Sequence, residues 1–481
     1  MKTNSMFYQR AFAAFTVGMF LSCAARVSQA QEIDRSKRPP SGKAPTLHLP
    51  TIQMRTLKNG IKVAVLEQHE LPVVSVRVVV DAQALLDPPG KEGVATLTSQ
   101  MLAEGTTTRT ADQLAEAFAD LGNTVRPDGF TTVTANLDSS LVLLADMLLH
   151  PAFPQASLDR IRQNSLAQLK RSKDQPNFLA RRVFVNAVWG SGHPYERTTS
   201  EQSLTAITRD DLVAFHGKYY RPQNVKVVVA GDVTPAEAAA KIEKAFGKWP
   251  AGGFKARYVV PPPAPMTPGT IYLYDRPNSP QSVLLVGEAG PARNNPDFYA
   301  IDLMNTALGG AFSSRVNLNL RETHSFTYGA STGFNYRMTP QLGEFIAASP
   351  VATPKTDSAL VELMKELRDI RASRPLTAAE LSFAKSSATK SLPLNFETVD
   401  QIAGAGALVL REGLPLDYFN TLSARYRAVT AAQVNNAARK YIDPAKLAIV
   451  VVGDRKQIEA GLRAANVGPV VVVDENGKTI K

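Results

Sequence analysis

TRDDLVAFHGKYYRPQNVKVVVAGD, residues 208–232, has a counterpart in TAAQVNNAARKYIDPAKLAIVVVGD, residues 430–454. The two stretches align without a gap at a constant offset of 222 residues. Each predicts a threonine-capped helix that ends at a Lys-Tyr pair, then a turn with proline, an apolar strand and a Gly-Asp turn. A repeat with so long a period indicates two similar domains in tandem and not a solenoid of short units.

The starts of the two halves correspond as well. NGIKVAVLEQHELPVVSVRVVV (59–80) and PGTIYLYDRPNSPQSVLLVGE (268–288) each predict a strand, a polar turn with proline and an alternating strand. Helical patterns such as LDRIRQNSLAQLKRSKD (158–174) alternate with these strands. We therefore predict an α+β fold in which helices pack on mainly antiparallel sheets.

A proline-rich segment marks the boundary between the halves. VVPPPAPMTPGT (259–270) contains five prolines and can form neither a helix nor a central strand. It separates a predicted N-terminal domain over 31–258 from a predicted C-terminal domain over 271–481.

The first 30 residues differ from the rest of the chain. Lys2 and Arg10 precede the apolar run AFAAFTVGMFLSCAA, and Ser28-Gln29-Ala30 offers a signal peptidase site. This pattern predicts a cleaved secretory signal and an exported, periplasmic protein. The alternative is a lipid anchor at Cys23, the only cysteine, because FLSC loosely resembles a lipobox. No later stretch reaches 18 apolar residues, so no transmembrane segment is predicted.

The charge of the chain is moderately basic, with a formal net charge of +11 over 481 residues. The densest basic run is KRSKDQPNFLARR (170–182), which is typical of a solvated helix face. Basic residues do not alternate with aromatic ones, and we predict no nucleic-acid partner.

The order of these elements resembles the pitrilysin/insulinase family of zinc metallopeptidases, in its bacterial short-chain branch. The resemblance covers nearly the whole mature chain. It is carried by an NG turn before a strand, by GVATLTSQMLAEGT (93–106), by HPY (193–195) and by LGGAFSSRVNLNLRETHSFTYGAS (308–331). The resemblance implies two homologous domains that form half of a clamshell.

In that family, zinc is held by an H-x-x-E-H motif on a helix and by a later glutamate, and the Glu of the motif is the general base. Here Thr96, Ser99 and Gln100 occupy the three motif positions. Residues 117–195 contain no glutamate, and Gln168 is the nearest counterpart of the third ligand. No two of the six histidines lie within five positions of each other. We therefore predict no metal site in this chain.

The family's second signature is an arginine and a tyrosine, which Arg321 and Tyr328 match. They are seven residues apart, so two helical turns would point both the same way. In the family this pair reaches the zinc site: the tyrosine hydroxyl can stabilise the oxyanion, and the arginine can hold a substrate carbonyl or carboxylate.

Four neighbours of this signature have two possible roles. Glycines shape the turn before the helix, and serines cap the helix or lie in its first turn. The alternative is direct contact with substrate. These residues are Gly309, Gly310, Ser313 and Ser314. A further candidate for substrate contact is the alternating stretch DGFTTVTANL (128–137), because in the family a strand here can pair with extended peptide.

Three functions remain open. The leading hypothesis is a subunit that is inactive alone and supplies Arg321 and Tyr328 in trans to a zinc-bearing homologous partner, around a peptide substrate. This chain would then need no cofactor, and zinc would lie in the partner. The second hypothesis is a peptide-binding or scaffolding pseudoenzyme with no role in hydrolysis. The third is a self-sufficient peptidase with an unusual metal site. The wide spacing of the histidines and the lack of glutamate in residues 117–195 argue against it.

Overall fold

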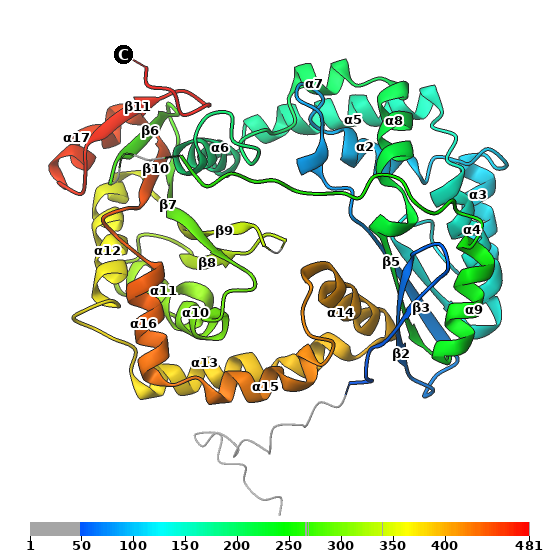
Figure 1. The fold of residues 1–481 in the computed structure, drawn as a ribbon. Coiled ribbons are helices and arrows are strands. Elements are labelled where there is room, and N and C mark those ends of the chain that lie inside the picture. Colours follow the sequence, from blue (N-terminus) through cyan, green and yellow to red (C-terminus); the bar gives the residue numbers. More distant parts are fainter. Residues whose placement is uncertain (1–48, 265–266, 268, 339, 481) are drawn as a thin grey trace, which may run out of the picture. The chain divides into compact units, whose positions relative to one another are not determined.

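Two sheets, one in each half of the chain, form the framework (Figure 1). The N-terminal sheet has the strand order β1-β2-β5-β3-β4. Its strands are β1 Gln53–Thr56, β2 Lys62–Glu67, β3 Val73–Val80, β4 Gly129–Val133 and β5 Val225–Gly231. The C-terminal sheet has the order β11-β6-β10-β7-β9-β8. Its strands are β6 Ile271–Asp275, β7 Gln281–Ala292, β8 Ser331–Asn335, β9 Leu342–Ala352, β10 Ala448–Gly453 and β11 Val470–Val473.

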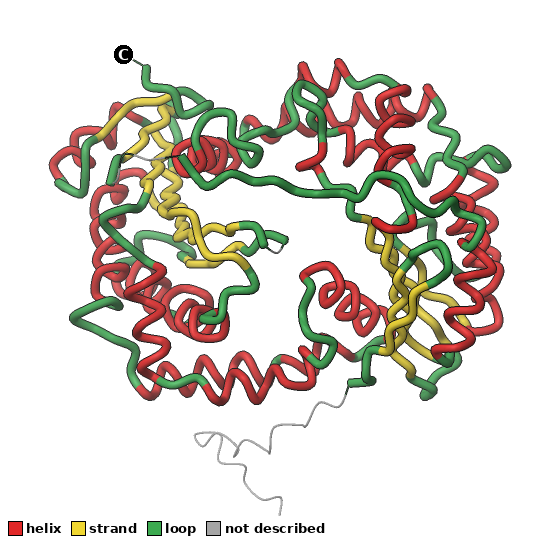
Figure 2. The backbone as a smooth tube through the Cα atoms, in the orientation of Figure 1, coloured by secondary structure: helices red, strands yellow, loops and turns green. Residues whose placement is uncertain are grey.

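Antiparallel pairs predominate in both sheets, as predicted; only β2 with β5, β6 with β10 and β6 with β11 are parallel. Helices cover the sheets, as Figure 2 shows in red and yellow. Those of the first half are α2 Val94–Met101, α3 Ala111–Asp120, α4 Leu137–Leu149, α5 Gln155–Lys173, α6 Pro176–Trp189, α7 Glu201–Ala206, α8 Arg209–Tyr219 and α9 Pro235–Phe246. Those of the second half are α10 Phe298–Asn305, α11 Arg315–Asn317, α12 Thr356–Asp369, α13 Ala378–Lys390, α14 Val399–Glu412, α15 Tyr418–Ala428, α16 Ala431–Tyr441 and α17 Arg455–Ala464.

Short 3₁₀ and π turns complete the secondary structure. The 3₁₀ turns are Ala84–Leu86, Thr134–Asn136, Pro222–Asn224, Thr353–Lys355 and Leu392–Phe396. The two π-helical turns, Thr306–Gly310 and Leu318–Thr323, flank α11. Both fall within the stretch that carries the Arg/Tyr signature.

The computed structural model describes residues 49–480 except 265, 266, 268 and 339, and these described residues belong to one compact unit. The predicted signal peptide, with Cys23, lies outside the described residues. In the described part of the proline-rich segment, residues 259–264 form neither helix nor strand. The domain boundaries at 258 and 271 stay predictions. Within the described ranges, no helix is long and apolar enough to cross a membrane.

The internal repeat appears in the structure at the predicted offset. Thr208 caps α8 and Thr430 caps α16, each accepting a hydrogen bond from the backbone N–H three residues later. The strands that follow, β5 and β10, occupy corresponding places. Each lies between two strands of its half, parallel to the earlier one (β2 or β6) and antiparallel to the later one (β3 or β7). The repeat is therefore a repeat of the fold.

Each half contributes one helix that packs on the sheet of the other half. Helix α6 of the first half packs on β7 and β10, whereas α14 of the second half packs on β3 and β5 (Figure 1). Both faces of the central strands are buried for this reason. In β5, Val227 and Val229 face the first half's own core, while Val228 and Ala230 join the core that contains α14.

Polar contacts hold the two exchanged helices. Asp400 of α14 accepts two hydrogen bonds from Arg77 of β3, at 2.6 and 2.5 Å. Trp189 of α6 donates its indole N–H to Glu344 of β9 at 2.7 Å, and Arg337 pairs with the same carboxylate at 3.0 Å. Burial alone would raise the pKa of Glu344, but Arg181 and Arg337 lower it below its ordinary value.

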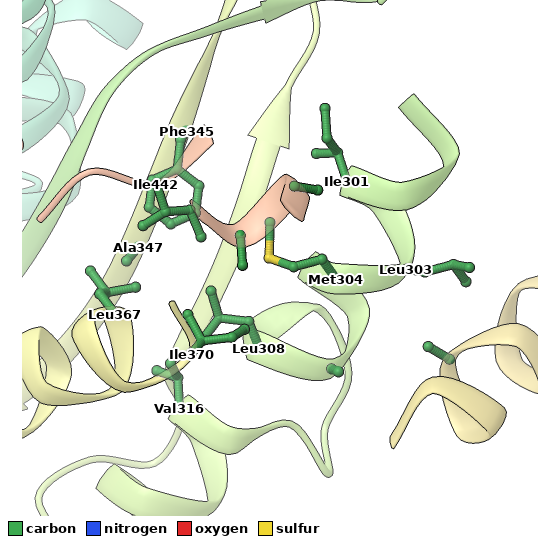
Figure 3. Packing of buried hydrophobic residues seen from close by; sticks show 14 of the residues in the cluster. Ile301, Leu303, Met304, Leu308, Val316, Phe345, Ala347, Leu367, Ile370 and Ile442 are labelled. Atoms are coloured by element: carbon green, nitrogen blue, oxygen red, sulfur yellow. The ribbon is translucent and has the colours of Figure 1, made fainter. Parts of the chain in front are cut away.

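The largest core lies under the second sheet (Figure 3). Ile301, Met304 and Leu308 from α10 and the π turn after it meet Phe345 of β9 and Ile370 beyond α12, and all five are almost fully buried. This packing fixes the start of the segment that leads to Arg321.

The sheet edges differ between the halves. The strand β4 is an edge strand, since it pairs only with β3. The corresponding strand of the second half is β9, because both strands lead through a 3₁₀ turn into a long helix. However, β8 pairs with β9 and takes the edge position there. On its side away from β3, β4 therefore has no strand partner in the sheet.

Candidate functional site

Helix α2 carries the three positions that correspond to the family's zinc motif. It begins at Gly93, which has a φ of 113°. The buried carboxylate of Asp87 accepts hydrogen bonds from the N–H groups of Gly93 and Ala95, at 2.7 and 2.8 Å, and so holds the first turn. Burial raises the pKa of Asp87. Leu97 and Met101 face the core.

The exposed side of α2 forms one wall of a pocket of about 250 Å³. Thr96 and Gln100 line it from α2, and Gln168 lines it from α5. The other lining residues are Gly93, Leu97, Ser165, Leu169, Ser172, Thr199 and Leu204. The structure thus brings together the three residues at the expected metal-ligand positions, out of four at zinc-motif positions in all, including Gln168 from a distant helix.

The fourth residue, Ser99, does not line this pocket. Its hydroxyl is hydrogen-bonded to that of Tyr220, which follows α8. Burial raises the pKa of Tyr220 to about 12, so the phenol stays neutral. At the position of the family's general base, this chain has a structural hydrogen bond between α2 and the end of α8.

Zinc does not fit this pocket. Protein ligands of zinc are cysteine thiolate, histidine nitrogen and the carboxylates of aspartate and glutamate. The side chains that line the pocket supply only hydroxyl, amide and apolar groups. Across the part of the chain that the structure describes, no group of three His, Cys, Asp or Glu side chains could hold a metal ion.

The guanidinium of Arg321 lies in the second π turn, Leu318–Thr323. Its carbon is 4.5 Å from the centroid of the Phe312 ring, within the range of a cation–π contact. Its Nη1 is 3.1 Å from a carboxylate oxygen of Glu322, the next residue. The side chain of Arg321 is 33% exposed, so it can still reach a ligand.

Tyr328 lies beyond the end of that turn and is 88% exposed. The helical segment ends at Thr323, and Ser325 has a positive φ of 52°. The prediction that Arg321 and Tyr328 lie two turns apart on one helix is therefore wrong. The backbone beside Tyr328 is fixed by Thr327, whose hydroxyl donates to the carbonyl of Pro350 and accepts from the N–H of Gly329 at 3.0 Å.

Two sequence-family matches cover most of the described chain. Residues 62–200 match the family described as "Insulinase (Peptidase family M16)", and residues 206–388 match the one described as "Peptidase M16 inactive domain". The chain belongs to peptidase family M16. The resemblance that the motifs indicated is thereby confirmed.

Individual M16 relatives span nearly the same length. An "Uncharacterized zinc protease YmxG" of Bacillus subtilis is 24% identical over 81% of this chain and 95% of its own. A "Probable mitochondrial-processing peptidase subunit beta" of Arabidopsis thaliana is 24% identical over 85% of this chain and 79% of its own. The crystal structure of a peptidase M16 inactive domain from Pseudomonas fluorescens superposes with a TM-score of 0.75, at 28% identity, over 84% of this chain and 98% of that one.

The two glycines of this M16 chain before α11 are required by close packing. A Cβ on Gly309 would lie 2.4 Å from the backbone nitrogen of Thr332 in β8. A Cβ on Gly310 would lie 3.1 Å from the carbonyl oxygen of Asn305. Both glycines belong to the first π turn, and π turns often occur at functional sites.

The two serines differ from each other. Ser314 is buried and occupies the N-cap position of α11, but its side chain makes no capping hydrogen bond, so the predicted capping contact is absent. Ser313 is exposed and lines a separate pocket with Arg315, Asn319 and His324. Contact of either serine with substrate stays a prediction.

The sequence reading missed Phe312. It is 71% exposed and lies under the guanidinium of Arg321. A signal was present, because a large aromatic residue stands between small residues in GGAFSS, before the helix begins.

Proposed function

We propose that this M16 chain is a subunit of an exported, heterodimeric zinc peptidase, inactive alone, that supplies Arg321 and Tyr328 to a zinc-bearing homologous partner. One observation carries the proposal. Tyr328 is 88% exposed, and Arg321 keeps an accessible side chain, although the pocket of Thr96, Gln100 and Gln168 has lost all metal-binding chemistry. The chain therefore retains one half of a catalytic site and lacks the other half.

Each residue has a chemical role in this proposal. The Tyr328 hydroxyl donates a hydrogen bond to the oxyanion that forms when the peptide carbonyl is attacked, a contact worth several kcal/mol when preorganised. The Arg321 guanidinium holds a substrate carbonyl or carboxylate through charge-assisted hydrogen bonds. The open edge of β4 can pair with extended peptide by strand addition.

Two further observations support a two-chain, exported enzyme. One M16 relative of this chain is named as a subunit of a processing peptidase. The first 30 residues have the charge and apolar pattern of a secretory signal. In this proposal the zinc belongs to the partner, whose identity stays open.

The first test is the native mass and zinc content of the tagged protein, isolated gently from its own cell envelope. A complex with one distinct chain of similar size and about one zinc ion is the expected result. A zinc-free monomer or self-dimer would favour the second candidate, a peptide-binding or scaffolding protein. The pocket of neutral hydroxyl and amide groups makes that candidate chemically reasonable.

The second test is Tyr328→Phe in the complex. Losing one oxyanion donor lowers kcat by about 10²-fold or more, and the native mass of the complex should not change. Tyr272→Phe, a matched hydroxyl deletion on β6, should leave kcat unchanged. Equal kcat for the Tyr328→Phe complex and the unmodified one would exclude the oxyanion role.

A further inference from the structure

An exposed aromatic ring stands beside the Arg/Tyr signature. Phe312 is 71% exposed. Its ring lies 4.5 Å from the guanidinium carbon of Arg321. Its carbonyl accepts a hydrogen bond from Asn317 at 2.7 Å, and Asn317 accepts one from the N–H of Ala330 at 3.1 Å. The buried Asn317 side chain thus joins the backbone of Phe312 to the segment that carries Tyr328.

We propose that Phe312 is the positioning residue for Arg321, holding the guanidinium flat against its ring and leaving the N–H donors free for a peptide ligand. The five N–H bonds of a guanidinium lie in its plane, so a contact through the face uses none of them. A carboxylate could also fix Arg321, but only by occupying the donors that the ligand needs. This inference rests on the proposed function of Arg321 and adds the residue that prepares it.

Glu322 competes with such a ligand. Its carboxylate lies 3.1 Å from Nη1 of Arg321, a nitrogen that is itself buried and makes no hydrogen bond of good geometry among the described residues. The two side chains are 33% and 52% exposed, and exposed ion pairs are weak. A peptide carbonyl or carboxylate must therefore reach Arg321 through the exposed part of its guanidinium, where the charge of Glu322 competes with that of the ligand.

Peptide binding to the purified chain tests the proposal. The probe is a fluorescein-labelled ten-residue peptide with a free C-terminal carboxylate, followed by fluorescence anisotropy. Phe312→Ala should weaken binding about two- to fivefold, as expected for a partly exposed cation–π contact, and Phe312→Tyr should restore it. Glu322→Gln should act in the opposite direction and tighten binding. Phe383→Ala, which removes a 45% exposed ring from α13, should leave binding unchanged.

A double-mutant cycle separates positioning from a general loss of structure. If Phe312 acts through Arg321, then Phe312→Ala should have no further effect in an Arg321→Ala background. Additive effects of the two substitutions would overturn the proposal.

The reactivity of Arg321 gives a second readout that needs no peptide. Phenylglyoxal modification, followed at Arg321 by mass spectrometry, should be faster in Phe312→Ala than in the unmodified chain or in Phe312→Tyr. An unchanged rate would overturn the stacking role. If Arg321→Ala does not alter peptide binding, the proposed function fails, while the phenylglyoxal rate still decides the role of Phe312.

Discussion

The side chains of Thr96, Gln100 and Gln168 meet in one pocket because α5 packs against α2. Thr96 and Gln100 are exposed on α2, so their replacement disturbs no core. The backbone that positions them is fixed separately, by the Asp87 cap and by the buried Leu97. The side chains that line the pocket can therefore change without a change in the fold around it.

Restoring that chemistry should restore metal binding. The variant Thr96→His, Ser99→Glu, Gln100→His, Gln168→Glu places two imidazoles and a carboxylate around the pocket and a second carboxylate at the motif's base position. We expect about one zinc ion per chain, measured by elemental analysis after dialysis against a chelator-free buffer.

Two controls define this experiment. The triple variant that keeps Gln168 should bind zinc more weakly, because a neutral amide is a poor zinc ligand. If the quadruple variant binds no zinc although it is folded, the correspondence between this pocket and the family's metal site is wrong.

At the scale of elements, a small-residue face lets α14 approach the first sheet. A Cβ on Gly406 would lie 2.8 Å from Val228 of β5 and 2.9 Å from Leu66 of β2. Gly404 lies two residues earlier on the same helix, and a Cβ there would meet open space. A side chain can therefore be added at Gly404 without a clash, but not at Gly406.

This difference predicts unequal effects of one substitution. Gly406→Val should lower the free energy of unfolding by about 1–3 kcal/mol more than Gly404→Val, because only the first overpacks the sheet. Both variants change helix propensity equally, so their difference isolates packing. Chemical denaturation measures it, and equal effects would show that α14 does not sit as closely on β2 and β5 as described.

A second element contact depends on pH. His216 of α8 donates from Nε2 to the carbonyl of Leu148 at 2.9 Å, and its ring stacks on Tyr220 with the ring centroids 4.7 Å apart. Since a carbonyl accepts, the ring nitrogen carries the proton here. Burial lowers the pKa of His216 from 6.5 to about 4. The folded state therefore takes up the second ring proton, at Nδ1, less readily than the unfolded state.

The sign of the pH effect follows from that lowered pKa. The stability from neutral His216 is fully present above about pH 6.5 and is lost as the pH falls toward 4. Between pH 7 and 4.5 the unmodified chain should lose roughly 2 kcal/mol more than His216→Gln, which keeps the donor and cannot titrate. His150→Gln is the surface control, with a side chain 58% exposed. Parallel pH profiles for His216→Gln and the unmodified chain would contradict the prediction.

Local signals in the sequence predicted individual helices and strands well, but they did not predict which elements pack against one another. The caps at Thr208 and Thr430 could be predicted because a capping contact spans three residues. The seven-residue spacing of Arg321 and Tyr328 led to a wrong prediction of one continuous helix. A π turn that ends at Thr323 and the positive φ of Ser325 break the helical period. The sequence linked Gln168 to the positions on α2 through family resemblance alone, because no local pattern joins α2 to α5.

The exchange of α6 and α14 is the main feature at the scale of the whole molecule. Apolar faces on both helices are visible in the sequence, but a pattern cannot say which sheet they cover. In the structure, each sheet depends on a helix from the other half for one of its faces. The repeat therefore predicted two similar folds and not their mutual dependence.

Neither half should fold alone. Residues 31–258 would lose the cover of α14 and expose the apolar face of β5, and residues 259–481 would lose α6 from β10. We expect each half to aggregate when expressed separately and both to become soluble when expressed together. A monomeric, cooperatively unfolding N-terminal half would contradict this expectation, and size-exclusion chromatography with thermal unfolding decides it.

The short connection from α5 to α6, residues 174 and 175, carries a wider consequence. Helix α6 packs in the core of the other half. Helix α5, which bears Gln168, is joined directly to α6, so its position does not depend on the identity of residue 168. The ligand positions on α2 face solvent, where substitutions change stability little. In this architecture the ability to fold is inherited separately from the ability to hydrolyse. A lineage can give up its metal, or regain it, without passing through an unfolded ancestor.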